Sequence, residues 1–314
     1  MTLKAITLAG PTAVGKTDLS MTLAKSLKGV IINADSMQIY DVLRVVSARP
    51  SGQEMGTIPH RLFGDIDPAK AYSVADWQAA AMDHAEEAWE NGMTPLFTGG
   101  TGMYFTSLLD GMSSIPEIDP DIRQNVRARA EEEGSEVLHA ELEKLDREIF
   151  ERLSPGDSQR VSRALEVVLS TGKPLSQWQK ENIPGPLKGV DIAGRVLKIV
   201  LSRPREQLYE RINQRFAEMF ESGAVDEVKA LLDRGLDKNL PAMKALGVPS
   251  IVAYLQGDME KSDAIVDAQQ QTRRFAKRQM TWFRQQFSDW HVLDLTSATV
   301  EQELAALIND FKGL

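Results

Sequence analysis

Residues that can bind phosphate stand together near the start of the chain. Positions 10–17 read Gly-Pro-Thr-Ala-Val-Gly-Lys-Thr and directly follow a largely apolar stretch at 6–9. Glycines let successive backbone N–H groups turn toward phosphate oxygens, the lysine adds a positive charge, and the final hydroxyl can bind Mg²⁺ at a helix N-terminus. The run therefore predicts a phosphate-binding P-loop, and the alternative is a glycine turn before an ordinary helix. Its residues are Gly10, Pro11, Thr12, Ala13, Val14, Gly15, Lys16 and Thr17, with Thr17 as the magnesium ligand.

Two further polar segments stand where later strands are expected to end. One reads Asn-Ala-Asp-Ser-Met-Gln at 33–38, and the other reads Gly-Gly-Thr-Gly at 99–102. The carboxyl ends of parallel strands meet at one edge of a sheet, so we expect Asp35 and Thr101 to lie beside the P-loop. A carboxylate there can accept a proton, bind Mg²⁺ or cap a helix, and Thr101 can also be a helix cap.

The elements that must position these residues alternate between strand and helix. Apolar runs predict strands at 4–9, 29–33, 94–98, 196–201 and 291–295. Helical patterns occupy 16–27, 73–91, 101–110, 204–221 and 264–287. This alternation is typical of an α/β fold with a doubly wound parallel sheet. Charged helical sequence interrupts it, so we predict a P-loop core domain at 1–116 and 191–314 with a helical insertion domain at 117–190.

Composition restricts the class of protein. The 314 residues, of which 42% are hydrophobic, suffice for one large domain or two ordinary ones. No apolar run is long enough to cross a membrane and no signal peptide precedes the first strand, so we expect a cytoplasmic protein. The chain has no cysteine and only four dispersed histidines, which excludes disulfides and thiolate zinc sites. Mg²⁺ carried with phosphate is the expected cofactor.

The charge pattern indicates a local site for a polyanion. The net charge of −9 disfavours unspecific attraction to nucleic acid. Basic residues nevertheless gather in three segments, at 123–129, 159–163 and 272–284. A basic surface on an acidic protein favours a shaped polyanion site, and a solvated helix face is the alternative for each cluster.

Taken together, the motifs resemble a known family. The chain contains no Asn-Lys-x-Asp guanine-binding motif, which disfavours GTPases. Its motifs resemble those of the bacterial tRNA dimethylallyltransferases, which form the IPP transferase family. The segments that carry the resemblance cover nearly the whole chain and lie at 10–17, 35–40, 59–62, 99–101, 157–166, 211–216 and 272–279. The chain departs from the family pattern in two places. The segment Val-Ser-Ala-Arg-Pro at 46–50 stands where Gly-Thr-Ala-Lys-Pro is frequent, and Val248 stands where tyrosine is common.

The resemblance implies a reaction. A dimethylallyl group would pass from dimethylallyl diphosphate to N6 of the adenosine on the 3′ side of the anticodon, position 37 of tRNA. The P-loop would hold the leaving diphosphate rather than a nucleotide, with Lys16, Arg215 and Mg²⁺ neutralising its charge. Asp35 would accept the proton of the adenine amine, and Thr101 would contact the base.

The implied partners are the anticodon stem-loop of tRNA and dimethylallyl diphosphate. The adenine must leave its stack before it can react, so contacts on both sides of the base are expected. The residues expected to contact tRNA are Asp35, Ser36, Met37, Gln38, Thr101, Arg123, Gln159, Arg160, Val161, Ser162, Arg163, Arg273, Arg274, Lys277 and Arg278. We expect a monomer without membrane contact. Two alternatives stay open, namely an ATP-binding kinase of a small metabolite and a nucleotide-gated RNA-binding module.

Overall fold

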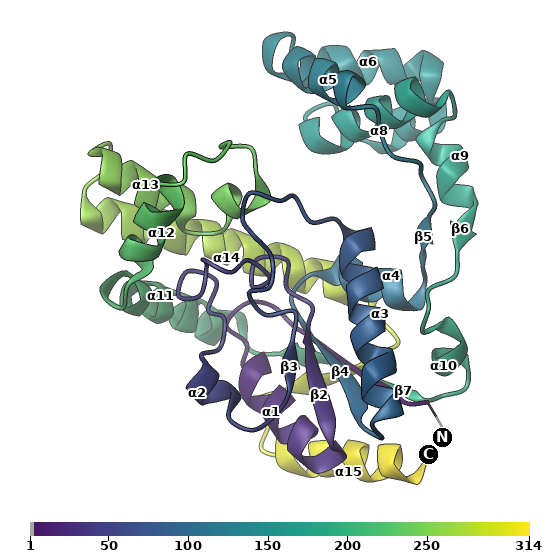
Figure 1. The fold of residues 1–314 in the computed structure, drawn as a ribbon, viewed down its shortest axis with the longest axis vertical. Coiled ribbons are helices and arrows are strands. Elements are labelled where there is room, and N and C mark those ends of the chain that lie inside the picture. The colour runs from purple at the N-terminus through teal and green to yellow at the C-terminus, as the bar shows by residue number, and fades with distance from the viewer. Residues whose placement is uncertain (1–2) are drawn as a thin grey trace. The chain divides into compact units, whose positions relative to one another are not determined.

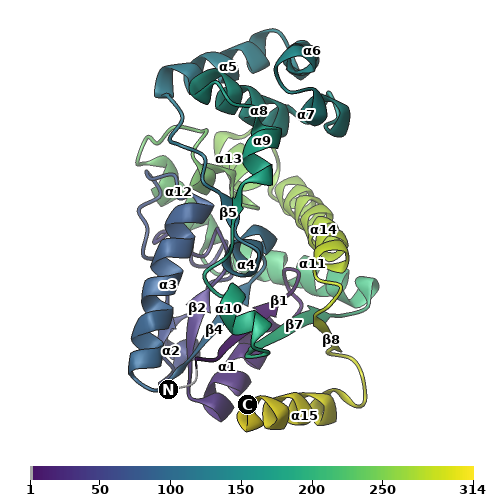
Figure 2. The ribbon, with the colours of Figure 1, turned by 90° about the vertical axis from the view of Figure 1, so that its right-hand side faces the viewer.

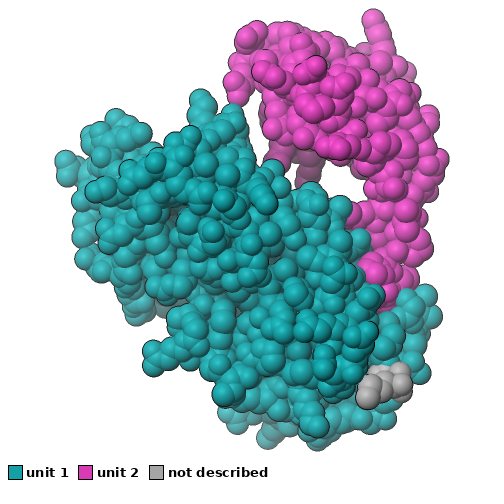
Figure 3. Space-filling view, in the orientation of Figure 1, with its two compact units in different colours: residues 1–108, 189–314 teal, residues 109–188 magenta. Residues whose placement is uncertain are grey.

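The computed structural model describes residues 3–314, and the chain divides into two compact units (Figure 3). The core unit contains the residues up to Leu108 together with Gly189–Leu314. The insertion unit contains Leu109–Lys188. It therefore includes the turn-rich segment 111–116, which the sequence-based boundary at residue 117 leaves in the core.

The core unit is built on a six-stranded parallel sheet with the order β3-β2-β4-β1-β7-β8. The strands are β1 (Ala5–Ala9), β2 (Gly29–Asn33), β3 (His60–Arg61), β4 (Thr94–Gly99), β7 (Val196–Ser202) and β8 (His291–Asp294). Every residue of β1 and β2 is buried, as expected of parallel strands that are covered on both faces. The predicted α/β fold with a parallel sheet is confirmed, whereas the two-residue strand β3 is too short for sequence patterns to predict.

Strand register brings the predicted site residues to one edge of the sheet. Ala9 at the end of β1 pairs with Gly99 of β4 and Val200 of β7, and Asn33 at the end of β2 pairs with Thr98 of β4. The carboxyl ends of β1, β2 and β4 are therefore level, and the segments that follow them share one edge.

The helices of the core unit pack around the sheet. They are α1 (Lys16–Leu27), α2 (Gly52–Met55), α3 (Val74–Glu90), α4 (Gly102–Leu109), α10 (Lys188–Ile192), α11 (Arg205–Glu221), α12 (Ala224–Leu232), the 3₁₀ helix η1 (Pro241–Lys244), α13 (Val248–Gln256), α14 (Lys261–Gln286) and α15 (Val300–Gly313). Helices α1 and α15 lie side by side (Figures 1 and 2) and share one apolar core with β1 and β7.

Trp77 of α3 is fully buried, stacks on Tyr104 and donates from Nε1 to the Asn33 carbonyl at 2.7 Å. It thereby fixes the end of β2.

The insertion unit is helical and has its own core. Its elements are β5 (Met112–Ser113), α5 (Pro120–Glu132), α6 (Ser135–Leu145), α7 (Arg147–Arg152), α8 (Ser158–Thr171), α9 (Leu175–Lys180) and β6 (Asn182–Ile183). Apolar side chains of α5, α6, α7 and α8 form one buried cluster, and β5 pairs antiparallel with β6. Within residues 3–314, no helix is long and apolar enough to span a membrane.

Candidate active site

The phosphate loop, residues 10–17, links β1 to α1 in a preformed conformation. Gly15 has a φ of 116°, and Ala13 has a φ of 64°, which is uncommon for a residue with a side chain. A Cβ on Gly10 would lie 2.9 Å from Val14 Cγ1 and 3.1 Å from Leu201 Cβ, so glycine suits the start of the turn. Arg211 of α11 donates from Nε to the Ala13 carbonyl at 2.9 Å and stabilises the unusual backbone there.

Two cations stand at this loop in a largely desolvated setting. Lys16 donates from Nζ to the carbonyls of Gly10 and Pro11, each at 2.9 Å. Burial lowers the pKa of Lys16 to about 8, although Asp35 opposes that shift. Arg215 of α11 donates to Thr12 Oγ1 at 2.6 Å, and burial lowers its pKa to about 10. Both groups are thus charged at neutral pH, and each gains from an anion that replaces its lost hydration.

We expect the affinity for inorganic diphosphate to depend on pH through Lys16. The free protein loses the Lys16 proton as the pH rises through about 8, whereas a bound anion raises the pKa of that group. Below about pH 8, the ionisation of Lys16 should therefore leave the association constant for inorganic diphosphate unchanged. Above about pH 8, that constant should fall by up to about tenfold per pH unit. Titration calorimetry with inorganic diphosphate from about pH 7 to about pH 9.5 measures this fall.

Lys16→Arg is the matched control for that measurement. Arginine keeps its charge throughout this range, so the fall above pH 8 should disappear in the variant. An equal fall in both proteins would contradict the assignment to Lys16.

Asp35 lies in a tight turn directly after β2. Asn33 accepts the Asp35 N–H at 2.8 Å and donates to the Asp35 carbonyl at 2.9 Å. The Asp35 carboxylate accepts the Met37 N–H at 3.0 Å through Oδ1. This bond is the kind that a structural cap makes, yet the carboxylate also lines the cavity beside Lys16. The turn, residues 34–38, therefore presents a fixed carboxylate to the phosphate loop.

Thr101 joins the end of β4 to that turn. Its Oγ1 accepts the Ser36 N–H at 3.0 Å and lies 3.3 Å from Ser36 Oγ, while its own N–H donates to the Ala34 carbonyl at 3.1 Å. The predicted neighbours Asp35, Ser36 and Thr101 are thus brought together.

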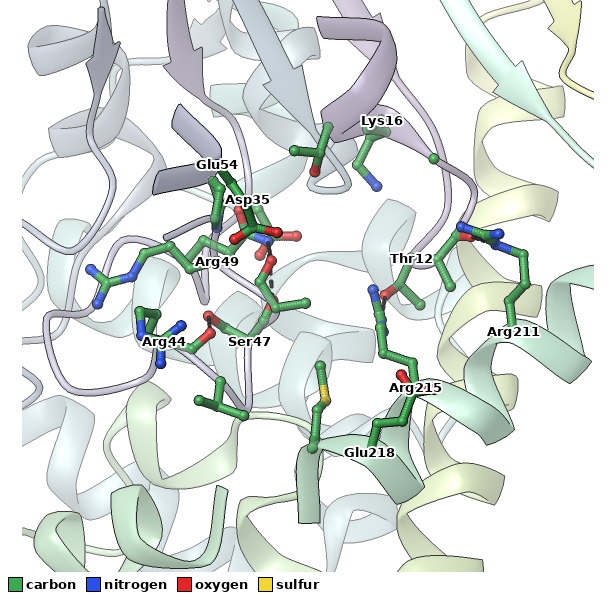
Figure 4. Close-up of a pocket in the computed structure, with 18 of the residues that line it drawn as sticks. Thr12, Lys16, Asp35, Arg44, Ser47, Arg49, Glu54, Arg211, Arg215 and Glu218 are labelled. Atoms are coloured by element: carbon green, nitrogen blue, oxygen red, sulfur yellow. Dashed lines mark hydrogen bonds between the residues drawn. The ribbon is translucent and has the colours of Figure 1, made fainter. Parts of the chain in front are cut away.

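A cavity of about 580 Å³ opens between the phosphate loop, the Asp35 turn, α11 and a wall at 44–50 (Figure 4). Its positive charges are Lys16, Arg44, Arg49, Arg211 and Arg215, and its negative charges are Asp18, Asp35, Glu54 and Glu218. Cations from three different segments face one space, which favours a compact anionic ligand.

Residues 44–50 form a wall that is held by distant side chains. Glu227 of α12 accepts the N–H groups of Val45 at 2.8 Å and Val46 at 3.1 Å. Gln38 donates from Nε2 to the carbonyls of Ser47 at 3.0 Å and Ala48 at 3.1 Å. Gln38, which we expected to contact tRNA, therefore also braces the cavity.

The wall also contains Arg49, one of the residues that depart from the family pattern. Arg49 donates to the Asp41 carbonyl at 2.7 Å, and burial lowers its pKa. Its guanidinium occupies the space over Gly64, where a Cβ would lie 1.1 Å from an Arg49 nitrogen. Arg49 thus has a structural role within the wall.

In the insertion unit, the predicted RNA-contacting residues lie on α5 and at the start of α8. Gln159 and Arg160 are exposed, Arg123 and Arg163 are half-buried, and Val161 and Ser162 are buried. Asp157 caps α8 by accepting the Arg160 N–H at 3.3 Å, and Glu166, itself buried, lies 3.2 Å from Arg127 and 3.6 Å from Arg163. Val161 and Ser162 are buried, so packing within the insertion unit accounts for their positions.

The basic helix is α14, and its charges differ in exposure. Arg274, Lys277 and Arg278 are exposed, whereas Arg273 is half-buried and donates to Asn213 Oδ1 at 2.5 Å. The exposed three can contact a polyanion, while Arg273 also joins α14 to α11.

Several residues of the site were not predicted from the sequence. Asn33, Arg211, Glu227 and Gln279 bond directly to the phosphate loop, the Asp35 turn or the wall. Arg211 could have been found, because it lies one helical turn before Arg215 on the same face of α11.

Comparisons with known proteins show which sequences this chain resembles. A family model described as IPP transferase matches residues 38–286, and one described as isopentenyl transferase matches residues 1–65. A tRNA dimethylallyltransferase of Methylobacterium nodulans is 47% identical over 95% of this chain and 97% of its own length. That of Azorhizobium caulinodans is 48% identical over 91% of this chain and 90% of its own.

Solved structures of similar proteins have the same fold as this chain. A tRNA isopentenylpyrophosphate transferase from Bacillus halodurans superposes with a TM-score of 0.70 at 33% identity, covering 99% of this chain and 96% of its own. A eukaryotic dimethylallyltransferase acting on tRNA gives a TM-score of 0.80 at 27% identity, covering 99% of this chain and 80% of its own.

Proposed function

This chain belongs to the IPP transferase family, and from that membership we infer that it is a tRNA dimethylallyltransferase, which prenylates an adenosine of tRNA. The observation that supports this function best is the placement of Lys16, Arg215 and Asp35 around one cavity. The two cations can bind a diphosphate, and the carboxylate can accept a proton in the same space.

We propose dimethylallyl diphosphate as the donor, with its diphosphate in the phosphate loop. The bond between the allylic carbon and the diphosphate oxygen breaks, and its electron pair leaves with the diphosphate. The adenine N6 forms the new C–N bond and gives its proton to the Asp35 carboxylate. An exocyclic amine is a weak nucleophile, so stabilising the leaving group is the main task of Lys16 and Arg215.

We propose that the diphosphate binds with Mg²⁺. Among residues 3–314, no group of three or more acidic or histidine side chains could hold a metal ion unaided. Thr17 is an exposed residue in the first turn of α1 and lines the cavity beside Lys16. A single hydroxyl ligand fits Mg²⁺, which takes few protein ligands and completes its shell with phosphate oxygens and water. When bound, the ion neutralises charge on the leaving diphosphate.

The five-carbon tail of the donor has an apolar place beside these groups. A small cavity of about 50 Å³ is lined by Thr12, Asp35 and Arg215. Its apolar lining residues are Met37, Val46, Ile212, Phe216, Met219, Ala245, Leu246 and Phe275. We propose that this cavity holds the dimethylallyl group, because its mostly apolar lining adjoins Thr12 and Arg215 on the diphosphate side and Asp35.

Shortening Met219 should relax selectivity for donor length. Met219 lines both cavities, so Met219→Ala adds room where a longer tail would extend. We expect the preference for dimethylallyl over geranyl diphosphate, measured as a ratio of kcat/KM, to fall by about tenfold or more. Met280→Ala is the control, because Met280 lines a separate cavity. An unchanged ratio in Met219→Ala would place the tail elsewhere.

We propose that the RNA partner is the anticodon stem-loop. Gln159, Arg160, Arg163 and Arg123 on the insertion unit supply one set of contacts to the loop and its phosphates. On the core unit, α14 supplies the exposed Arg274, Lys277 and Arg278. Arg273 lies on the same helix and is bonded to Asn213. The segment 35–38 and Thr101 lie next to the extruded base. We further propose that the enzyme is a cytoplasmic monomer.

Incubation with unmodified tRNA, Mg²⁺ and dimethylallyl diphosphate tests the proposed function. Mass spectrometry of the nucleosides should reveal an adenosine that carries one added five-carbon group. ATP turnover without RNA, and without such a product, would instead support a kinase. Retention of tRNA with no modification would support a binding module.

A further inference from the structure

One buried side chain of α14 bridges the two loops that build the site. Gln279 accepts the Thr12 N–H through Oε1 at 2.9 Å and donates from Nε2 to the Gly100 carbonyl at 2.8 Å. Its side chain is nearly removed from solvent, with the residue 6% exposed. Both ends of a buried carboxamide are thus bonded to backbone, which fixes the side chain and both of its partners.

Glycines after β4 make room for α14. A Cβ on Gly100 would lie 2.4 Å from Gln279 Nε2, and a Cβ on Gly102 would lie 2.1 Å from the Trp282 ring. Gln279 and Trp282 are neighbours on one side of the helix. The glycines at the start of α4 therefore leave room for Gln279 and Trp282 of α14.

The two partners of Gln279 belong to opposite sides of the proposed reaction. Thr12 lies in the phosphate loop, and its hydroxyl accepts from Arg215. Gly100 precedes Thr101, whose hydroxyl accepts the Ser36 N–H beside Asp35. A continuous chain of hydrogen bonds and backbone therefore leads from Arg215 through Gln279 to the Asp35 turn.

We propose that Gln279 is a positioning residue that holds the phosphate loop at a fixed distance from the Asp35 turn. This inference rests on the proposed function, because it assigns the leaving diphosphate to the first of these segments and the attacking amine to the second. In a displacement reaction, both groups must be in line at the reacting carbon. A misplacement of about 1 Å can cost about 100-fold in rate.

Two variants of similar volume remove one or both bonds. Gln279→Met keeps the length of the side chain and loses both bonds. Gln279→Glu keeps an acceptor for the Thr12 N–H but loses the donor to Gly100. With both substrates saturating, we expect kcat to fall by about 100-fold in Gln279→Met and by a smaller factor in Gln279→Glu, with KM for tRNA changed less than threefold. The affinity for inorganic diphosphate, measured by calorimetry, should fall as well, because Thr12 and Arg215 lose their support.

The control is Gln285→Met, an exposed position on the same helix. It should leave kcat and diphosphate affinity unchanged. Thermal unfolding separates stability from positioning, since a merely structural role lowers Tm but leaves kcat per folded molecule intact. Unchanged kcat in folded Gln279→Met would overturn the inference while the wild-type protein still transferred a prenyl group. Absence of transfer by the wild-type protein would overturn the proposed function instead, and the calorimetry would still report on Gln279.

Discussion

Asp35→Asn is expected to reduce prenyl transfer by about 100- to 10,000-fold while tRNA binding persists. Asparagine retains an oxygen that can accept the Met37 N–H, so the tight turn after β2 should survive the change. What it loses is the ability to take the N6 proton as the C–N bond forms. Single-turnover transfer at saturating enzyme measures the rate, and filter binding of labelled tRNA measures the affinity.

Asp35→Glu is the informative partner of that variant. It restores a carboxylate on a longer side chain, so we expect activity between those of Asp35→Asn and the wild type. Near-normal turnover in Asp35→Asn would refute the role of Asp35 as the proton acceptor, and equal loss in both variants would point to its structural role in the turn.

Arg215→Met is expected to lower kcat by about 100- to 1,000-fold, the range found when one group that stabilises developing charge is removed. Arg215 donates to Thr12 at the phosphate loop, and its burial means that little water screens it from a bound anion. Negative charge grows on the diphosphate as the allylic bond breaks, so the factor by which kcat falls should exceed the factor by which the affinity for dimethylallyl diphosphate falls. Comparing kcat with the dissociation constant of dimethylallyl diphosphate measures both effects.

Arg205→Met, at the exposed start of the same helix, is the matched control and should leave both quantities unchanged. If Arg215→Met weakened binding and left kcat intact, Arg215 would serve only to bind the donor.

Local patterns were sufficient to predict the core of this fold. Buried apolar runs such as Ala5–Ala9 and Gly29–Asn33 are continuous, as strands covered on both faces must be, and α1 ends at Leu27 before the buried glycine at position 29. Because the carboxyl ends of parallel strands meet at one edge of the sheet, the sequence alone predicts that Asp35 and Thr101 lie next to the phosphate loop.

The supporting residues could not be predicted in this way. Gln279 ends a segment that resembles the family, but its partners Gly100 and Thr12 lie 179 and 267 residues earlier in the chain, and no local pattern indicates these bonds. Glu227 looks like an ordinary acidic residue in the first turn of α12, yet it holds the wall of the cavity. Such contacts depend on how α12 and α14 pack against the sheet edge, which local sequence patterns do not encode.

The stoichiometry of one turnover tests most directly whether the phosphate loop holds the leaving group of prenyl transfer. Enzyme in excess is mixed with unmodified tRNA, Mg²⁺ and dimethylallyl diphosphate, and released diphosphate and prenylated adenosine are measured in the same samples. We expect equal amounts of both products at every time, no release of diphosphate without tRNA, and no substitution of ATP for the prenyl donor. Phosphate released from ATP, with no prenylated adenosine formed, would contradict the claim that the phosphate loop holds a leaving group of prenyl transfer.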